Sequence, residues 1–150
     1  IHEIIHTGDI SGRGSFAWRV LHWSILLEKW EDKKILGYGL DTLDMVSPWK
    51  AAAHSDYLRY LVETGIIGCS IFLIFIAKSG KEIWRTFYYF RSRDSEMTFL
   101  VWVIFSIYSA WIIGSLADNF ITSTPFQYYF WALLGAVMAK RDNYSNNLFI

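Results

Sequence analysis

Apolar residues in this chain gather in long runs, and three of these runs have the composition of membrane spans. A hydrocarbon core of about 30 Å requires about 20 helical residues, each adding roughly 1.5 Å. Residues 97–117 reach that length, and residues 125–139 form a shorter run whose aromatic first half suits a membrane interface. Residues 56–77 form the remaining run, of which Gly65 to Ala77 is purely apolar. The pattern therefore predicts three transmembrane helices.

The scarcity of charge supports this interpretation. Between Met97 and Lys140 the only charged residue is Asp118, which the surface of a soluble protein would not tolerate over that length. The chain is 53% apolar and 19% aromatic, well above soluble usage, and its formal net charge is zero. Arg59 and Glu63 lie within the first predicted span, so they should face protein or a water-filled cavity. We predict an all-α integral membrane protein with no nucleic-acid partner.

Basic residues predict which ends of the spans face the cytoplasm. They cluster after the first span and at the end of the last, whereas the loop of residues 118–125 has none. Both basic segments should therefore be cytoplasmic, which places residues 1–55 on the periplasmic or extracellular face. The chain begins in the middle of an element, so we expect further spans upstream. The basic residues are Lys78, Lys81, Arg85, Arg91, Arg93, Lys140 and Arg141.

The outer-face segment contains one amphipathic helix and a glycine-rich turn. Residues 15–30 carry an apolar stripe at spacings of three and four, while the opposite face carries Arg19, His22 and Lys29. This pattern predicts a helix that lies on a bundle or membrane surface. Gly37 and Gly39 then bracket Tyr38, which allows a tight turn or a close backbone approach. The apolar stripe consists of Phe16, Val20, Trp23, Leu27 and Trp30.

A zinc-peptidase pattern occurs at the start of the chain. Residues 2–6 read HEIIH, in which two histidines one helical turn apart bind zinc and the glutamate activates water. Thr7, Gly8 and Asp9 would break such a helix directly after His6. The context therefore argues against a zinc site, and we predict no metal.

A second group of polar residues suits the recognition of a diphosphate. Arginine binds phosphate oxygens in a bidentate manner, and histidine can accept a proton near neutral pH. Each residue also has a structural alternative: headgroup contact for the arginines, a structural hydrogen bond for the histidine, a helix cap for Asp56, and an ion pair with Arg59 for Glu63. The group consists of Arg13, Arg19, His54, Asp56, Tyr57 and Glu63.

The order of these motifs resembles a known membrane family. The sequence reads SGR, then Trp18, then LGYGL, then AHSDYLRYLVETGIIG before an apolar helix. This order is similar to the C-terminal domain of O-antigen ligases and related O-antigen or exopolysaccharide polymerases, over about residues 7–77. The resemblance implies that the chain is the C-terminal part of a polytopic bundle like that of GT-C glycosyltransferases, in the bacterial inner membrane with its active face in the periplasm.

The resemblance also implies roles for individual residues. Arg13 would bind the diphosphate of an undecaprenyl-linked glycan donor, and His54 would activate the acceptor, a glycan or the lipid A core. The reaction would invert the anomeric centre without a metal or other cofactor. Ser55 departs from the family pattern, which has Asn after the histidine, and Asp56 is then the candidate partner of His54. Supporting positions would be Trp18, Gly37, Gly39, Glu63, Gly65 and Gly68.

A transporter or a structural membrane subunit is the remaining class. Transporters carry ionisable or helix-breaking groups near the membrane midplane. In the span of residues 97–117 only Ser106, Ser109 and Gly114 have that character, and small residues there usually serve helix packing. The charged residues instead cluster at one end of the spans, which favours the glycosyltransferase.

Overall fold

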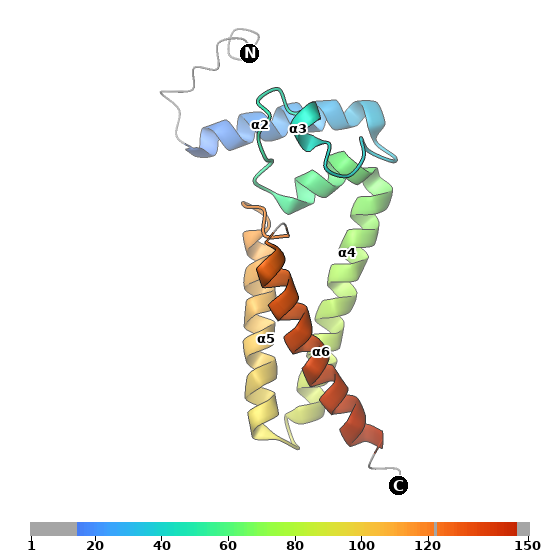
Figure 1. Ribbon diagram of the computed structural model, residues 1–150, viewed down its shortest axis with the longest axis vertical. Helices are drawn as coiled ribbons and strands as arrows, with labels where there is room; N and C mark the ends of the chain where they lie inside the picture. Colours follow the sequence, from blue (N-terminus) through green and yellow to red (C-terminus); the bar gives the residue numbers. More distant parts are fainter. Residues whose placement is uncertain (1–14, 122, 147–150) are drawn as a thin grey trace. The chain divides into compact units, whose positions relative to one another are not determined.

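The computed structural model describes residues 15–121 and 123–146, and within these residues the helices are joined by turns and loops without any strand. They form two compact units. The first unit comprises residues 15–72 together with residues 115–119, and the second comprises residues 73–114 and 120–146. The helices are α2 (Ser15–Trp30), η1 (Glu31–Lys33), α3 (Leu43–Val46), α4 (Asp56–Phe90), α5 (Ser95–Gly114) and α6 (Thr124–Asn146) (Figure 1).

The first unit packs α2, α3 and the beginning of α4 around a small apolar core. Leu26 from α2, Leu43 from α3 and Val62 from α4 are buried together with Ala53. The Trp23 indole N–H donates to the Ala53 carbonyl oxygen at 2.6 Å, which ties α2 to the loop before α4. Helix α2 has the bounds that the sequence predicts for this helix.

Helix α4 is interrupted at Gly65, whose backbone has φ 64° and ψ −168°. Such angles end the regular hydrogen-bond ladder, because the N–H groups of Ile66 and Ile67 can no longer reach the carbonyls of Val62 and Glu63. Four backbone polar groups inside the first unit therefore need other partners.

The turn after η1 supplies those partners. Tyr38 and Gly39 donate their backbone N–H groups to the Val62 and Glu63 carbonyls at 3.1 and 2.8 Å. In return, the N–H groups of Ile66 and Ile67 donate to the carbonyls of Lys34 and Ile35 at 2.8 and 3.4 Å. The glycine-rich turn thus completes the helix at its break.

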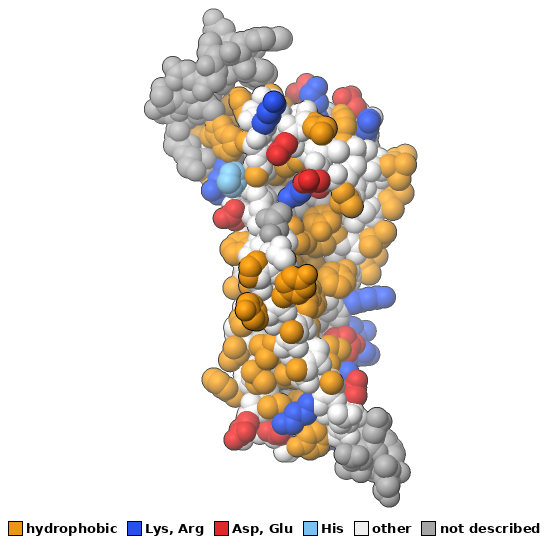
Figure 2. Space-filling model, in the orientation of Figure 1, with side chains coloured by type: hydrophobic (Ala, Val, Ile, Leu, Met, Phe, Trp, Pro, Cys, Tyr) orange, Lys and Arg blue, Asp and Glu red, His pale blue; other side chains and the backbone are white. Residues whose placement is uncertain are grey.

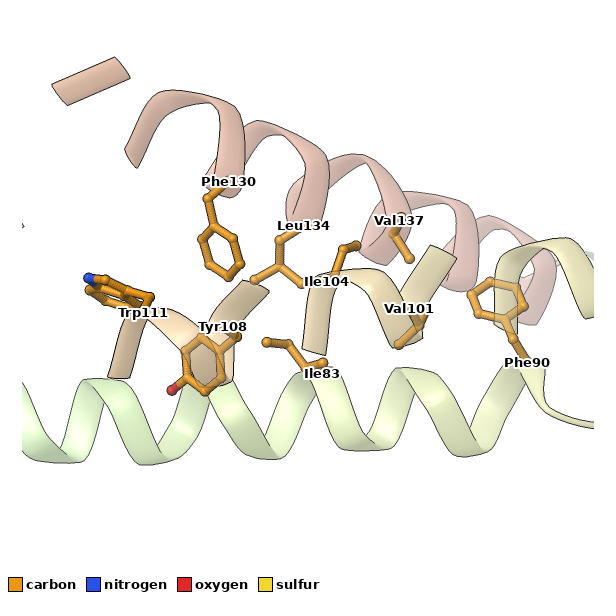
Figure 3. Close-up of a cluster of buried hydrophobic side chains, with 9 residues drawn as sticks. All are labelled: Ile83, Phe90, Val101, Ile104, Tyr108, Trp111, Phe130, Leu134 and Val137. Carbon is orange, nitrogen blue, oxygen red and sulfur yellow. The ribbon is translucent and has the colours of Figure 1, made fainter. Parts of the chain in front are cut away.

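The second unit is a three-helix arrangement of α4, α5 and α6 with its own apolar core. Figure 3 shows side chains from all three helices directed toward one another. Tyr108 illustrates the packing, because its ring stacks on Phe130 with centroids 6.0 Å apart and its hydroxyl donates to the Ile76 carbonyl. The buried core residues are Ile83, Phe90, Val101, Ile104, Tyr108, Trp111, Phe130, Leu134 and Val137.

Charged side chains gather at the end of the second unit where α4 passes into α5 (Figure 2). Arg141 on α6 lies 3.3 Å from Glu82 and donates to the Thr86 hydroxyl at 2.9 Å, both on α4. Lys140 lies 3.7 Å from Asp94. These pairs join the two basic segments that the sequence predicts to share one side of the membrane.

Two described helices, α4 and α5, are long and apolar enough to cross a membrane. In the most apolar stretch of each, 22% of the residues are buried, whereas the core helix of a soluble protein would be mostly buried. Helix α6 lies where the third span was predicted but is not among them, so that span stays a prediction. Helix α4 also continues beyond the predicted span to Phe90, and α5 ends at Gly114 rather than at residue 117.

Candidate functional site

His54 lies in the first unit at the entrance to α4. Its backbone is in the left-handed region with φ 50°, and 38% of its side chain is exposed. Ser55 follows and caps the helix, because its hydroxyl accepts the Leu58 N–H at 3.5 Å. Serine and asparagine are both preferred at this position, so Ser55 preserves a role that the family's asparagine could fill. The cap that the sequence assigned to Asp56 belongs to Ser55.

The imidazole of His54 faces a carboxylate from the connection between α5 and α6. Its Nδ1 lies 3.6 Å from Oδ1 of Asp118. The backbone N–H of Asn119 donates to the same oxygen at 2.8 Å. This hydrogen bond, together with the neighbouring His54 and the positive charge of Arg19, holds the pKa of Asp118 below its ordinary value. Asp118 is therefore a stable anion beside the histidine.

Two hydrogen bonds hold the segment of residues 115–119 in this position. The backbone N–H of Asp56 donates to the Ser115 carbonyl at 2.9 Å. Nη1 of Arg19 donates to the Ala117 carbonyl at 2.9 Å. Arg19, His54 and Asp118 consequently form one cluster, here called the histidine cluster.

Beneath the histidine cluster is an aromatic layer centred on Trp18. Its ring centroid lies 6.1 Å from that of His54, 5.8 Å from that of Trp49 and 5.0 Å from that of His22. His22 is fully buried and shares a hydrogen bond of 2.9 Å between Nε2 and the Ser47 hydroxyl. The sequence placed His22 on the polar face of its helix, and this assignment is wrong because α3 and the following loop cover it.

Burial lowers the pKa of His22, and the proximity of a second histidine, His54, lowers it further. The folded chain therefore binds this proton more weakly than the unfolded chain, so stability should fall as the pH drops below about 6.5. The loss should not exceed about 1.4 kcal/mol per pH unit. In detergent, thermal unfolding between pH 7.5 and 5.5 should show a steeper decline for the native protein than for His22→Gln, which retains a donor for Ser47. Parallel profiles would contradict this prediction.

The other predicted side chains occupy different environments. Asp56 is fully buried on the first turn of α4, and Tyr57 beside it is half-buried. Glu63 is buried, and its Oε1 accepts the Arg59 Nε–H at 3.1 Å, as the structural alternative for Glu63 supposed. Arg59 also lies 3.0 Å from Asp41. Asp56 and Tyr57 thus follow His54 on the first turn of α4, whereas Glu63 pairs with Arg59.

The four glycines differ in how closely their surroundings pack. A Cβ added to Gly37 would lie 2.4 Å from the Glu63 carbonyl oxygen, and one added to Gly65 would lie 2.3 Å from the Ile35 carbonyl oxygen. Gly39 has φ 112°, and a Cβ there would lie 3.4 Å from Cγ2 of Thr42, which is an ordinary contact. A Cβ at Gly68 would lie 2.2 Å from the Thr64 side chain. Gly37 and Gly65 are thus the positions where turn and helix meet backbone to backbone.

Arg13 and the HEIIH motif lie outside the described residues, so their roles stay predictions. Within residues 15–121 and 123–146, no three acidic, histidine or cysteine side chains are grouped to hold a metal. Sequence reasoning noted Asp118 only as an isolated charge and did not place it in the site. The isolated position of Asp118 could have indicated a role in the site, because a single charge in a long apolar stretch requires a polar environment.

Comparison with known proteins gives one family match, in the N-terminal part of the chain. Residues 3–73 match a family model described as O-antigen ligase. No curated protein and no solved structure matches the chain. The matched stretch includes Trp18, Gly37 and His54 and ends before Asp118. The family suggests a membrane function of the O-antigen ligase or polymerase type. The resemblance inferred from the sequence is therefore confirmed, and residues 3–73 carry the sequence pattern of the O-antigen ligase family.

Proposed function

We propose that this chain is part of a membrane glycosyltransferase that moves a glycan from undecaprenyl diphosphate to an acceptor hydroxyl. The acceptor would be the lipid A core in a ligase, or another glycan in a polymerase, which is the alternative assignment. The family match supports the class of reaction. The observation that carries the proposal is the contact of His54 with Asp118, because it prepares an imidazole to accept a proton.

The proposed chemistry begins with the tautomer of His54. A proton on Nδ1 faces the Asp118 carboxylate, which leaves the Nε2 lone pair available. Nε2 would take the proton of the acceptor hydroxyl as its oxygen attacks the anomeric carbon of the donor. The bond from that carbon to the diphosphate breaks, the diphosphate leaves with the electron pair, and the anomeric configuration inverts. The carboxylate stabilises the imidazolium that forms.

Arginine would balance the charge that develops on the leaving diphosphate. We propose Arg13 as the main diphosphate ligand, as the family resemblance implies. Arg19 belongs to the histidine cluster and uses one nitrogen on the Ala117 carbonyl, so its remaining N–H groups can donate to a phosphate oxygen. Fixed positive charge beside the leaving diphosphate stabilises such a transition state. Arginine neutralisation leaves no need for a metal.

We propose different roles for the remaining candidates according to their burial. Tyr57 is half-buried and would contact the substrate through its hydroxyl. Asp56 would act as a positioning residue, since its backbone N–H holds the segment that carries Asp118. Glu63 would position Arg59 beside the glycine-rich turn. The site would face the periplasm from a multi-pass protein of the bacterial inner membrane, in contact with the lipid bilayer and the lipid-linked donor.

The proposal predicts glycan transfer by the full-length protein in proteoliposomes supplied with an undecaprenyl-diphosphate-linked glycan and an acceptor. Chelator should leave the rate unchanged, whereas a zinc peptidase would lose activity. Asp118→Asn should lower the rate of transfer about 10–100-fold, because the imidazolium loses roughly 1.4–2.8 kcal/mol of charge stabilisation. It should leave the KM for the donor nearly unchanged. Absence of transfer by the native protein, or full activity of Asp118→Asn, would overturn the corresponding assignment.

A further inference from the structure

The turn after η1 exposes two large aliphatic side chains side by side. Ile35 is 63% exposed and Leu36 is 73% exposed, and we call this pair the apolar tip. Single exposed aliphatic residues are common on soluble surfaces, but adjacent ones at the end of a turn mark a surface that contacts something apolar. The question is what lies against the apolar tip.

Backbone hydrogen bonds fix the apolar tip beside a defined point of α4. The carbonyls of Lys34 and Ile35 accept the N–H groups of Ile66 and Ile67. Those two isoleucines are themselves 53% and 48% exposed. They lie just after Glu63, the last charged residue before the charge-free stretch of residues 64–77. The apolar tip therefore lies where the membrane-spanning part of α4 becomes apolar.

The residues around the apolar tip are those that proteins place at a membrane surface. Lys33 lies over the ring of Tyr38 at 4.7 Å and Lys34 over the ring of Trp30 at 5.8 Å. Lysine, tyrosine and tryptophan are typical of the headgroup region, where an apolar stem or ring and a polar end are both accommodated. Glu31 and Asp32 precede the lysines, and Glu31 lies 3.9 Å from Lys34.

We propose that the apolar tip inserts into the edge of the hydrocarbon region beside α4, with Lys33 and Lys34 at the level of the lipid phosphates. The occupant of this surface is thus lipid, because the tip continues the exposed apolar face of α4 formed by Ile66, Ile67 and Ile71. The break at Gly65 is what brings the turn to this depth. The proposal requires α4 to cross the bilayer, and it does not depend on glycan transfer.

Site-specific fluorescence tests this insertion in the full chain. Cys69 is the only cysteine, so Cys69→Ser provides the background for Leu36→Cys labelled with a nitrobenzoxadiazole probe. The protein is reconstituted into phosphatidylethanolamine and phosphatidylglycerol vesicles with or without phosphatidylcholine brominated near the top of its acyl chains. The matched control is Asp44→Cys, an exposed position on α3 in the same unit. Ile35→Cys is a second test position if Leu36→Cys does not fold.

The probe at position 36 should emit at shorter wavelength than the probe at position 44 and lose intensity with brominated lipid. The probe at position 44 should do neither. Emission typical of water at position 36 would overturn the proposal. A blue shift without bromine quenching would also overturn it, because protein, either another segment or a second copy, would then cover the tip.

Discussion

Replacing His54 with glycine is expected to reduce glycan transfer by about 10³-fold, within the range that a general base contributes. Glycine is the informative substitution because His54 has φ 50°, which glycine adopts without strain. His54→Gly therefore removes the imidazole and leaves the backbone in place. The measurement is the rate of transfer by the full-length protein, with imidazole added to test for rescue. Partial rescue by imidazole would support a base at this position.

A neighbouring residue provides the control for backbone strain. Lys50 is exposed and has φ 49° in the loop before His54. Lys50→Ala retains a Cβ in the left-handed region and leaves the imidazole intact, so it should transfer glycan at nearly the native rate. Near-native transfer by His54→Gly would refute the catalytic assignment, and equal losses from both variants would attribute the effect to the loop.

Substitution of Gly65 with alanine is expected to cause the largest loss of stability in the first unit. The new Cβ would lie 2.3 Å from the Ile35 carbonyl oxygen and 2.6 Å from the Leu36 nitrogen, and backbone atoms cannot rotate away. The left-handed φ alone costs about 1–3 kcal/mol for a residue with a side chain. Separation of the turn from the helix would add the loss of its hydrogen bonds, so the total should reach about 3 kcal/mol or more.

The loss should appear as a lower unfolding temperature in detergent and as faster hydrogen exchange at Tyr38 and Gly39. Gly135→Ala is the matched control, because it lies on α6 and its added Cβ meets nothing within 4 Å. It should be neutral or slightly stabilising, since alanine favours a helix over glycine by up to about 1 kcal/mol. A Gly65→Ala protein as stable as Gly135→Ala would show that the turn does not pack against the helix break.

The helices could be predicted largely because their patterns are local. The apolar stripe from Phe16 to Trp30 identified α2, and Asp56, where the apolar run begins, marked the start of α4. The break at Gly65 could not be predicted, because a glycine within an apolar run is equally compatible with a straight helix. Only the hydrogen-bonding groups of the distant turn decide between the two, and their position is a tertiary property.

The candidate site could be predicted only in part, because some of its residues belong to local motifs and others meet only in the folded chain. His54 and Trp18 belong to sequence motifs, and the structure places their rings 6.1 Å apart. Asp118 approaches His54 only because α5 ends at Gly114 and returns residues 115–119 to the first unit. No local sequence pattern predicts that residues 115–119 pack in the first unit. His22 was misplaced because helical periodicity identifies the opposite faces of a helix but not whether another element covers the polar one.

The packing of residues 115–119 in the first unit also limits how this protein can be truncated or tagged. A fragment cut at the end of the family match would contain the imidazole but leave the Asp56 amide without the Ser115 acceptor that it has in the intact chain. The smallest piece able to reproduce the contact of His54 with Asp118 must therefore extend beyond Asp118, and we expect an epitope tag inserted within residues 115–119 to break that contact without altering the sequence of α5 or α6.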